Sequence, residues 1–182
     1  MVEKRERNFV MINRAPVLTL WATVVAEVLG FEHDEALTLG RAVAGLNAYS
    51  KGVALGLFQP TSKAIKEKRQ KLRKEETVTV DLLSRAVPAR YTKEGLRAVS
   101  GDTPIHPESV ETYLEGKFGD ALDEVREAML ELARSVPSSE LKGKAYGLYE
   151  KFRPEIPSGK RGWGALGKLD LDRIRKMADS EG

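Results

Sequence analysis

Cysteine and histidine are absent or rare in this chain of 182 residues, and its carboxylates are too abundant to nominate a general acid or base. Cysteine is absent, which excludes disulfides, zinc–thiolate sites, iron–sulfur clusters and a cysteine nucleophile. The two histidines, His33 and His106, stand beside expected turns or helix starts, and neither has a second histidine at a metal-binding spacing. We interpret both as capping or surface residues, and we predict no catalytic residue, no metal site and no cofactor.

The motifs of nucleotide-binding and hydrolase sites are absent as well. The sequence contains no P-loop, no GxGxxG motif after a strand and no GxSxG elbow. The cluster from Gly159 to Gly167 has the glycine-rich composition of a phosphate cradle, but it lacks the preceding strand and the following Lys-Ser/Thr pair. An enzyme is therefore our third hypothesis. It requires a pocket between two helical halves, where several of these side chains converge: His33, Asp34, Glu35, Arg41 and Tyr49.

Basic and acidic side chains are segregated along the chain. Residues 63–74, here called the basic segment, hold seven basic residues against the single acid Glu67: Lys63, Lys66, Lys68, Arg69, Lys71, Arg73 and Lys74. Six more basic residues lie between Lys160 and Lys176, where Trp163 stands among glycines. The stretch from Glu108 to Glu131 carries eight acids against two basic residues.

The charge pattern favours a surface that contacts phosphates. Lysine and arginine neutralise phosphates and release counterions, which supplies most of the affinity of non-specific nucleic-acid binding. A tryptophan on a glycine loop can stack on an unpaired base. We therefore predict a non-enzymatic protein that binds DNA or RNA with little sequence preference. The residues predicted to bind are the seven of the basic segment together with Lys160, Arg161 and Trp163.

Two other interpretations of the same charges stay open. The sequence has only two glutamines and three asparagines, a bias typical of thermophile proteins, whose helices are highly charged in any case. The basic segment would then be a solvated helix, and Trp163 would fold back onto the core. Alternatively, the basic segment pairs with the acidic stretch of the same chain or of a second subunit. The protein would then be a helical protein–protein interaction module or a homo-oligomer.

A nearly all-apolar stretch from Pro16 to Leu29 must organise the core. Its polar side chains are Thr19, Thr23 and Glu27, at positions i, i+4 and i+8, so the stretch is predicted to be a helix covered on most sides. Gly30 ends this helix, and the next one runs to about residue 48 with Gly40 and Gly45 among its apolar residues. Such small residues allow a neighbouring helix to approach closely.

The remaining patterns predict further helices and little else. Helices are expected from Pro107, from about residue 121 and from about residue 139, with a short last helix capped by Asp170. The alternation at Thr77–Val80, together with Val87–Tyr91, favours one short hairpin. We therefore predict an all-α, multi-helix bundle with at most a minor β-hairpin near 77–91. Two packed helical subdomains, 1–76 and 107–182, would be joined by a connector, 77–106.

One short segment resembles the hinge of helix-turn-helix DNA-binding domains. The Ala-x-x-x-Gly spacing from Ala26 to Gly30 carries this resemblance, over about 20 residues in all. It implies a recognition helix after the hinge, but that helix begins with Glu32-His33-Asp34-Glu35, whose acids would face the phosphates. No base-reading role is therefore assigned to it.

Nothing in the sequence predicts a membrane segment or export. No apolar run approaches the roughly 18–20 residues of a membrane helix, and the charged start is followed by an apolar run of only Phe9–Ile12. With cysteine absent, we expect a cytoplasmic protein and no membrane partner.

Overall fold

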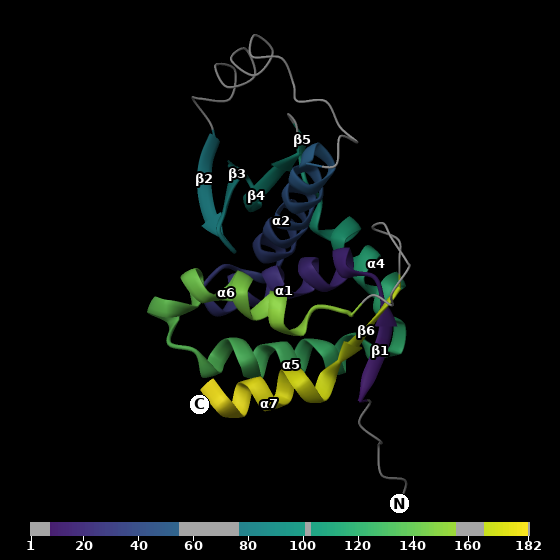
Figure 1. Cartoon of the computed structure of the whole chain (residues 1–182). Coiled ribbons are helices and arrows are strands. Elements are labelled where there is room, and N and C mark those ends of the chain that lie inside the picture. The colour runs from purple at the N-terminus through teal and green to yellow at the C-terminus, as the bar shows by residue number, and fades with distance from the viewer. Residues whose placement is uncertain (1–7, 55–76, 101–102, 156–165, 182) are drawn as a thin grey trace, which may run out of the picture.

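The computed structural model of the chain describes residues 8–54, 77–100, 103–155 and 166–181 (Figure 1). The elements follow in this order: β1 (Phe9–Ile12), α1 (Arg14–Val28), α2 (His33–Ala54), β2 (Thr77–Leu82), β3 (Arg85–Thr92), β4 (Gly95–Ser100), β5 (Thr103–Pro104), α4 (Pro107–Phe118), a 3-10 turn (Gly119–Ala121), α5 (Leu122–Ser135), α6 (Ser138–Phe152), β6 (Gly167–Asp170) and α7 (Leu171–Glu181).

The prediction of an all-α protein is wrong, because the protein is a helix-rich mixed α/β structure. The hairpin near 77–91 is present, with Val80 opposite Val87, but it belongs to a four-stranded antiparallel sheet of order β2-β3-β4-β5. A second sheet pairs β1 with β6. Strand β4 escaped prediction because Leu96 to Val99 are all buried, so it lacks the alternation of a half-buried strand.

Helix α1 lies at the centre of the molecule, as predicted. Every residue from Pro16 to Ala26 is buried. In Figure 1, α2 and the larger sheet lie above α1, whereas α5 and α7 lie below it. The indole Nε1 of Trp21 donates to the carbonyl oxygen of Ala145 in α6 at 2.8 Å, and the Trp21 ring meets Phe152 edge-on at 5.2 Å. This helix is therefore covered on several sides, as its apolar circumference requires.

The polar stripe of α1 is buried against α2. The hydroxyl of Thr23 donates to the carbonyl oxygen of Thr19 at 2.8 Å, and the hydroxyl of Thr19 donates to that of Ala15 at 2.9 Å. These bonds within the helix satisfy both hydroxyls without water. Gly40 of α2 lies directly against Thr19 and Thr23, so the predicted close approach at this glycine is confirmed.

The end of α1 matches the predicted glycine stop. Gly30 has a φ of 113°, and its N–H donates to the carbonyl oxygen of Glu27 at 3.1 Å. The N–H of Phe31 donates to that of Ala26 at 3.0 Å. This pair of bonds is a Schellman motif, in which a glycine adopts the left-handed conformation that other residues avoid.

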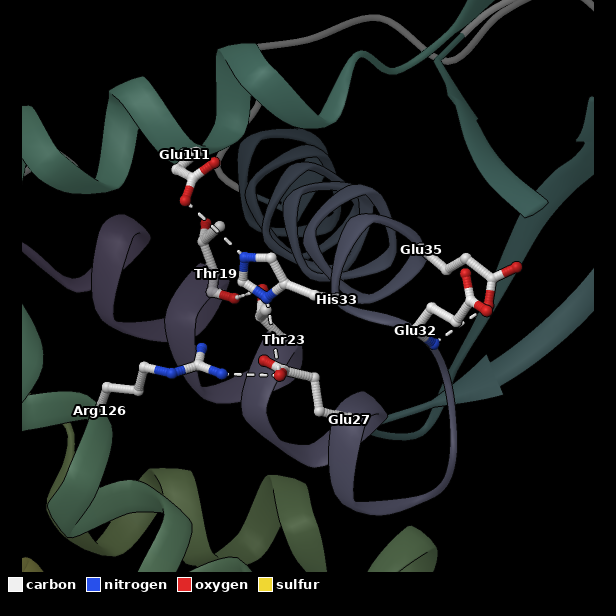
Figure 2. Close-up of polar contacts among 8 residues, drawn as sticks. All are labelled: Thr19, Thr23, Glu27, Glu32, His33, Glu35, Glu111 and Arg126. Atoms are coloured by element: carbon white, nitrogen blue, oxygen red, sulfur yellow. Dashed lines mark hydrogen bonds and ion pairs between the residues drawn. The ribbon is translucent and has the colours of Figure 1, made fainter. Parts of the chain in front are cut away.

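Side chains of α2 bind the part of β4 that is not paired with β5. Carboxylate oxygen Oε2 of Glu35 accepts the N–H of Leu96 at 2.9 Å, and Oγ1 of Thr38 accepts the N–H of Ala98 at 3.0 Å. The other carboxylate oxygen of Glu35 accepts the N–H of Glu32 at 3.1 Å, as in a capping box (Figure 2). These bonds fix the sheet to the first turns of α2.

Buried apolar residues of both predicted subdomains belong to one cluster. Trp21 and Leu37 lie in it together with Met129, Tyr149 and Ile174. The division into 1–76, 77–106 and 107–182 stays a prediction. In the part of the chain that the structure describes, no helix is long and apolar enough to cross a membrane.

Candidate functional site

The ten residues predicted to bind nucleic acid lie outside the described residues. They are Lys63, Lys66, Lys68, Arg69, Lys71, Arg73, Lys74, Lys160, Arg161 and Trp163. The structure does place the elements to which these segments are joined. The candidate interface is therefore built from the described residues on either side of them.

Helix α2 and strand β2 flank the basic segment. In the view of Figure 1, α2 ends and β2 begins at the top of the molecule. Thr77, the first residue of β2, pairs with Arg90 of β3. The next residue of β3, Tyr91, therefore lies beside the point at which the chain enters β2 from the basic segment.

Tyr91 is the most exposed large apolar side chain among the residues described, with 71% of its surface accessible. Its backbone is held in the sheet opposite Leu96 of β4. Lys93, two residues along, is exposed in the turn between β3 and β4 and has no ion pair with any described residue. Tyr91 and Lys93 are thus an exposed aromatic residue and an exposed basic residue at the same end of the sheet.

Two arginines lie opposite each other at the same end of the sheet. Arg90 pairs with Arg97 across β3 and β4. Arg97 is only 6% exposed, and it donates to the carbonyl oxygens of Leu96 at 2.9 Å and Glu94 at 3.5 Å. Two cationic residues therefore stand opposite each other at this end of the sheet, where Glu35 binds the N–H of Leu96 and Glu94 lies in the turn.

Charge distinguishes this sheet from the rest of the described structure. Residues 77–100 carry four basic side chains against two acids. The other described residues carry 14 lysines and arginines against 19 aspartates and glutamates. Residues 77–100 therefore have the same sign of net charge as the basic segment, whereas the acidic excess of the other described residues lies mainly in α4 and α5.

The second predicted segment joins the described structure at another corner. Glu155 and Lys168 exchange backbone hydrogen bonds of 3.0 and 3.1 Å, which hold together the two ends of the chain around residues 156–165. Nε of Arg14 donates to the carbonyl oxygen of Pro154 at 3.0 Å. Burial, and then the neighbouring charge of Arg153, lower the pKa of Arg14. Two arginines therefore lie close together where the chain leaves toward Lys160 and Arg161.

A separate polar cluster joins α1, α2, α4 and α5 (Figure 2). Oε2 of Glu27 accepts from Nη2 of Arg126 at 2.6 Å. His33 lies between two carboxylates, with Nδ1 3.6 Å from Oε2 of Glu27 and Nε2 3.8 Å from Oε1 of Glu111. Sequence reasoning missed the Glu27–Arg126 pair, because no local signal relates residues 99 positions apart.

The chemistry of this cluster is that of a structural ion pair. Glu27 is 19% exposed, and its other oxygen, Oε1, is buried without a hydrogen-bond partner among the described residues. No group of three or more potential metal-ligating side chains occurs in the described ranges. Arg126 therefore balances a carboxylate that the fold has largely removed from water.

The side chains named for the enzyme hypothesis have different neighbours. His33 lies between Glu27 and Glu111, whereas Glu35 is bound to β4. The guanidinium of Arg41 lies 5.1 Å from the ring centroid of Tyr113, whose pKa is raised by burial and lowered to a lesser degree by Arg41. The side chain of Tyr49 lies outside the described part. These observations do not support a shared pocket for the described members of the group.

Two surface hollows among the described residues are lined by other side chains. One, of about 410 Å³, is lined by Lys151, Arg173 and Lys176 with their neighbours. Another, of about 800 Å³, lies between α5 and α7 and is lined by residues such as Glu131 and Arg134. Neither includes a histidine. His106 directly precedes α4, as predicted, and its carbonyl oxygen accepts from Ser109.

Comparisons with models of protein families, with the curated proteins and with solved structures find no match for this chain.

Proposed function

We propose that this protein binds nucleic acid through the basic segment, residues 63–74. The observation that carries the proposal is the separation of charge. Residues 63–74 hold seven basic residues against one acid; Glu75 and Glu76 follow, and then a sheet with four basic side chains against two acids, while the remaining described residues together are net acidic. A polyanion would be attracted to the basic segment and repelled by the acidic surface of α4 and α5.

The arginines near the second basic segment support a further contact. Arg14 and Arg153 lie where the chain leaves toward Lys160, Arg161 and Trp163. These residues would add phosphate contacts and one aromatic ring. Because the warrant is electrostatic, the binding is sequence-tolerant and weakens with salt.

A charge-reversal experiment tests the proposal. The triple variant K66E/R69E/R73E is compared with K142E/K144E/K151E, whose three lysines are exposed on α6. Both variants change the net charge equally, so the comparison separates local contacts from overall repulsion. Affinity for a labelled 20-nucleotide single strand and for the corresponding duplex is measured by fluorescence anisotropy at several salt concentrations.

We expect the first variant to lose most of its affinity and the second to lose little. Loss of three phosphate contacts should reduce the slope of log K against log salt by about 2 for a single strand. Unchanged affinity in K66E/R69E/R73E, or an equal loss in both variants, would overturn the proposal. A salt-labile dimer in light scattering, with no retention of nucleic acid, would instead favour the oligomer hypothesis.

A further inference from the structure

We propose that Tyr91, supported by Lys93, is a base-stacking site that makes single-stranded nucleic acid the preferred ligand. This inference rests on the proposed function and specifies its substrate class. It places a contact on the described sheet, whereas the predicted contacts lie in the segments joined to it.

The first argument is the exposure of the ring. Tyr91 is 71% exposed, and among the described residues no aromatic ring or cation lies against it. Phe9, on β1, offers a useful contrast, since it is 49% exposed and the ammonium of Lys168 lies 4.9 Å from its ring centroid. The face of the Tyr91 ring is therefore available to a ligand.

The second argument is rigidity. Tyr91 is paired with Leu96, and the N–H of Leu96 is bound to Glu35 of α2. The neighbouring turn is held by Thr92, whose hydroxyl donates to the carbonyl oxygen of Gly95 at 2.8 Å and accepts the N–H of Glu94 at 3.2 Å. A ring presented from a fixed backbone loses little conformational entropy when a base stacks on it.

The third argument is position. Because Thr77 pairs with Arg90, Tyr91 lies next to the start of β2, which Glu75 and Glu76 separate from the basic segment in the sequence. Lys93 is exposed nearby and is free to contact a phosphate. A strand held by the basic segment would therefore pass close to an exposed aromatic residue and to an exposed lysine two residues further along the chain, the residue types that sequence-tolerant single-strand binding uses.

Stacking distinguishes single strands from duplexes. In a duplex the faces of the bases are covered by their neighbours, so an aromatic side chain on the protein surface has no base face to contact. In a single strand each base can leave the stack and offer its face. Tyr91 should therefore contribute to single-strand affinity and leave duplex affinity unchanged.

The test uses Tyr91→Ala, Tyr91→Phe and the control Phe9→Ala, in which the exposed aromatic residue of β1 is removed instead. Affinities for oligo(dT) of 20 residues and for a 20-base-pair duplex are measured by fluorescence anisotropy at fixed salt. We expect Tyr91→Ala to lose about tenfold for the single strand, the equivalent of one stacked base, and Tyr91→Phe to lose less than about twofold. The control should match the unmodified protein.

Each outcome separates this inference from the proposed function. If Tyr91→Ala binds the single strand normally while K66E/R69E/R73E does not, stacking at Tyr91 is wrong and the proposed function stands. If Tyr91→Phe loses as much as Tyr91→Ala, or if duplex affinity falls equally, the contact is not stacking and the inference is overturned. If the unmodified protein binds neither probe, both proposals fail.

Discussion

Replacement of Gly40 by alanine would add one methyl group where α1 and α2 touch. An ideal Cβ at Gly40 would lie 2.5 Å from the carbonyl oxygen of Thr19, 2.9 Å from the amide nitrogen of Thr23, and against Oγ1 of the same threonine. Two of these three atoms belong to the backbone of α1 and cannot rotate away. The two helices would therefore have to separate.

The magnitude follows from two opposing terms. Overpacking of a well-packed core costs about 1–3 kcal/mol and more when backbone atoms are in the way. Alanine in place of glycine within a helix stabilises the helix by about 1 kcal/mol. We expect Gly40→Ala to lower the free energy of unfolding by about 2 kcal/mol net, which for a chain of this size is about 4–8 °C in Tm.

Gly45 supplies a matched control in the same helix. It is exposed, and a Cβ there would meet no atom within 4 Å. Gly45→Ala should therefore raise the free energy of unfolding by about 0.5–1 kcal/mol. Urea unfolding monitored by circular dichroism and tryptophan fluorescence measures both variants. The reasoning is refuted if Gly40→Ala is as stable as Gly45→Ala.

Three further predictions concern buried polar groups. Arg126→Met leaves the largely buried carboxylate of Glu27 without its 2.6 Å partner and should lower the free energy of unfolding in urea by about 2–3 kcal/mol. The double variant with Glu27→Gln should regain most of this stability. If the effects of the two substitutions simply add, the two residues do not act as a pair. Burial raises the pKa of Tyr149, so the unfolded state releases its proton first and stability should fall as pH rises above about 10. Tyr149→Phe should flatten the dependence of unfolding free energy on pH between 9 and 11, and an unchanged slope would count against it. Thr38→Val removes the acceptor of the Ala98 N–H and should cost about 1–3 kcal/mol with faster exchange of that amide, whereas Thr38→Ser should retain both properties.

Local patterns in the sequence predicted several elements correctly. The apolar circumference of α1 and the stop at Gly30 depend on neighbouring residues, and both are present. The close approach of a helix was expected at Gly40 and Gly45 alike, and the structure shows it at Gly40 but not at Gly45. The helix start at Pro107 is also confirmed, and Asp170 accepts the N–H of Arg173 at 3.2 Å as a cap. Each of these features reflects backbone conformation or helix periodicity over a few residues.

The strands that the prediction missed depend on distant partners. β1 pairs with β6, which joins Phe9 to Asp170 across almost the whole chain. In β4 both faces are covered, so Leu96 to Val99 show no alternation. An all-α prediction follows when strands of this kind carry no local signal.

The candidate interface likewise has one part that the sequence predicted and one part that only the structure shows. Composition alone identified the basic segment, because charge is a property of the residues themselves. It could not identify Tyr91 as exposed, since alternation places Tyr91 on the same face as Val87 and Ala89, which are buried. The part of the protein that buries Val87 and Ala89 does not extend to Tyr91. Only the packing of the folded chain on the sheet determines how far this burial extends along β3.

The sequence by itself therefore determined the central helix, its glycine stop and the separation of charge, whereas the contact at Gly40 rather than Gly45 was decided by the packing of α1 on α2. The tertiary structure alone decided which strands pair, that Arg126 balances Glu27, and that Tyr91 faces solvent beside the start of β2. The physical reason is the distance along the sequence over which each effect acts. Backbone preference and side-chain charge act within a few residues, whereas burial and pairing depend on which distant segments the folded chain brings together.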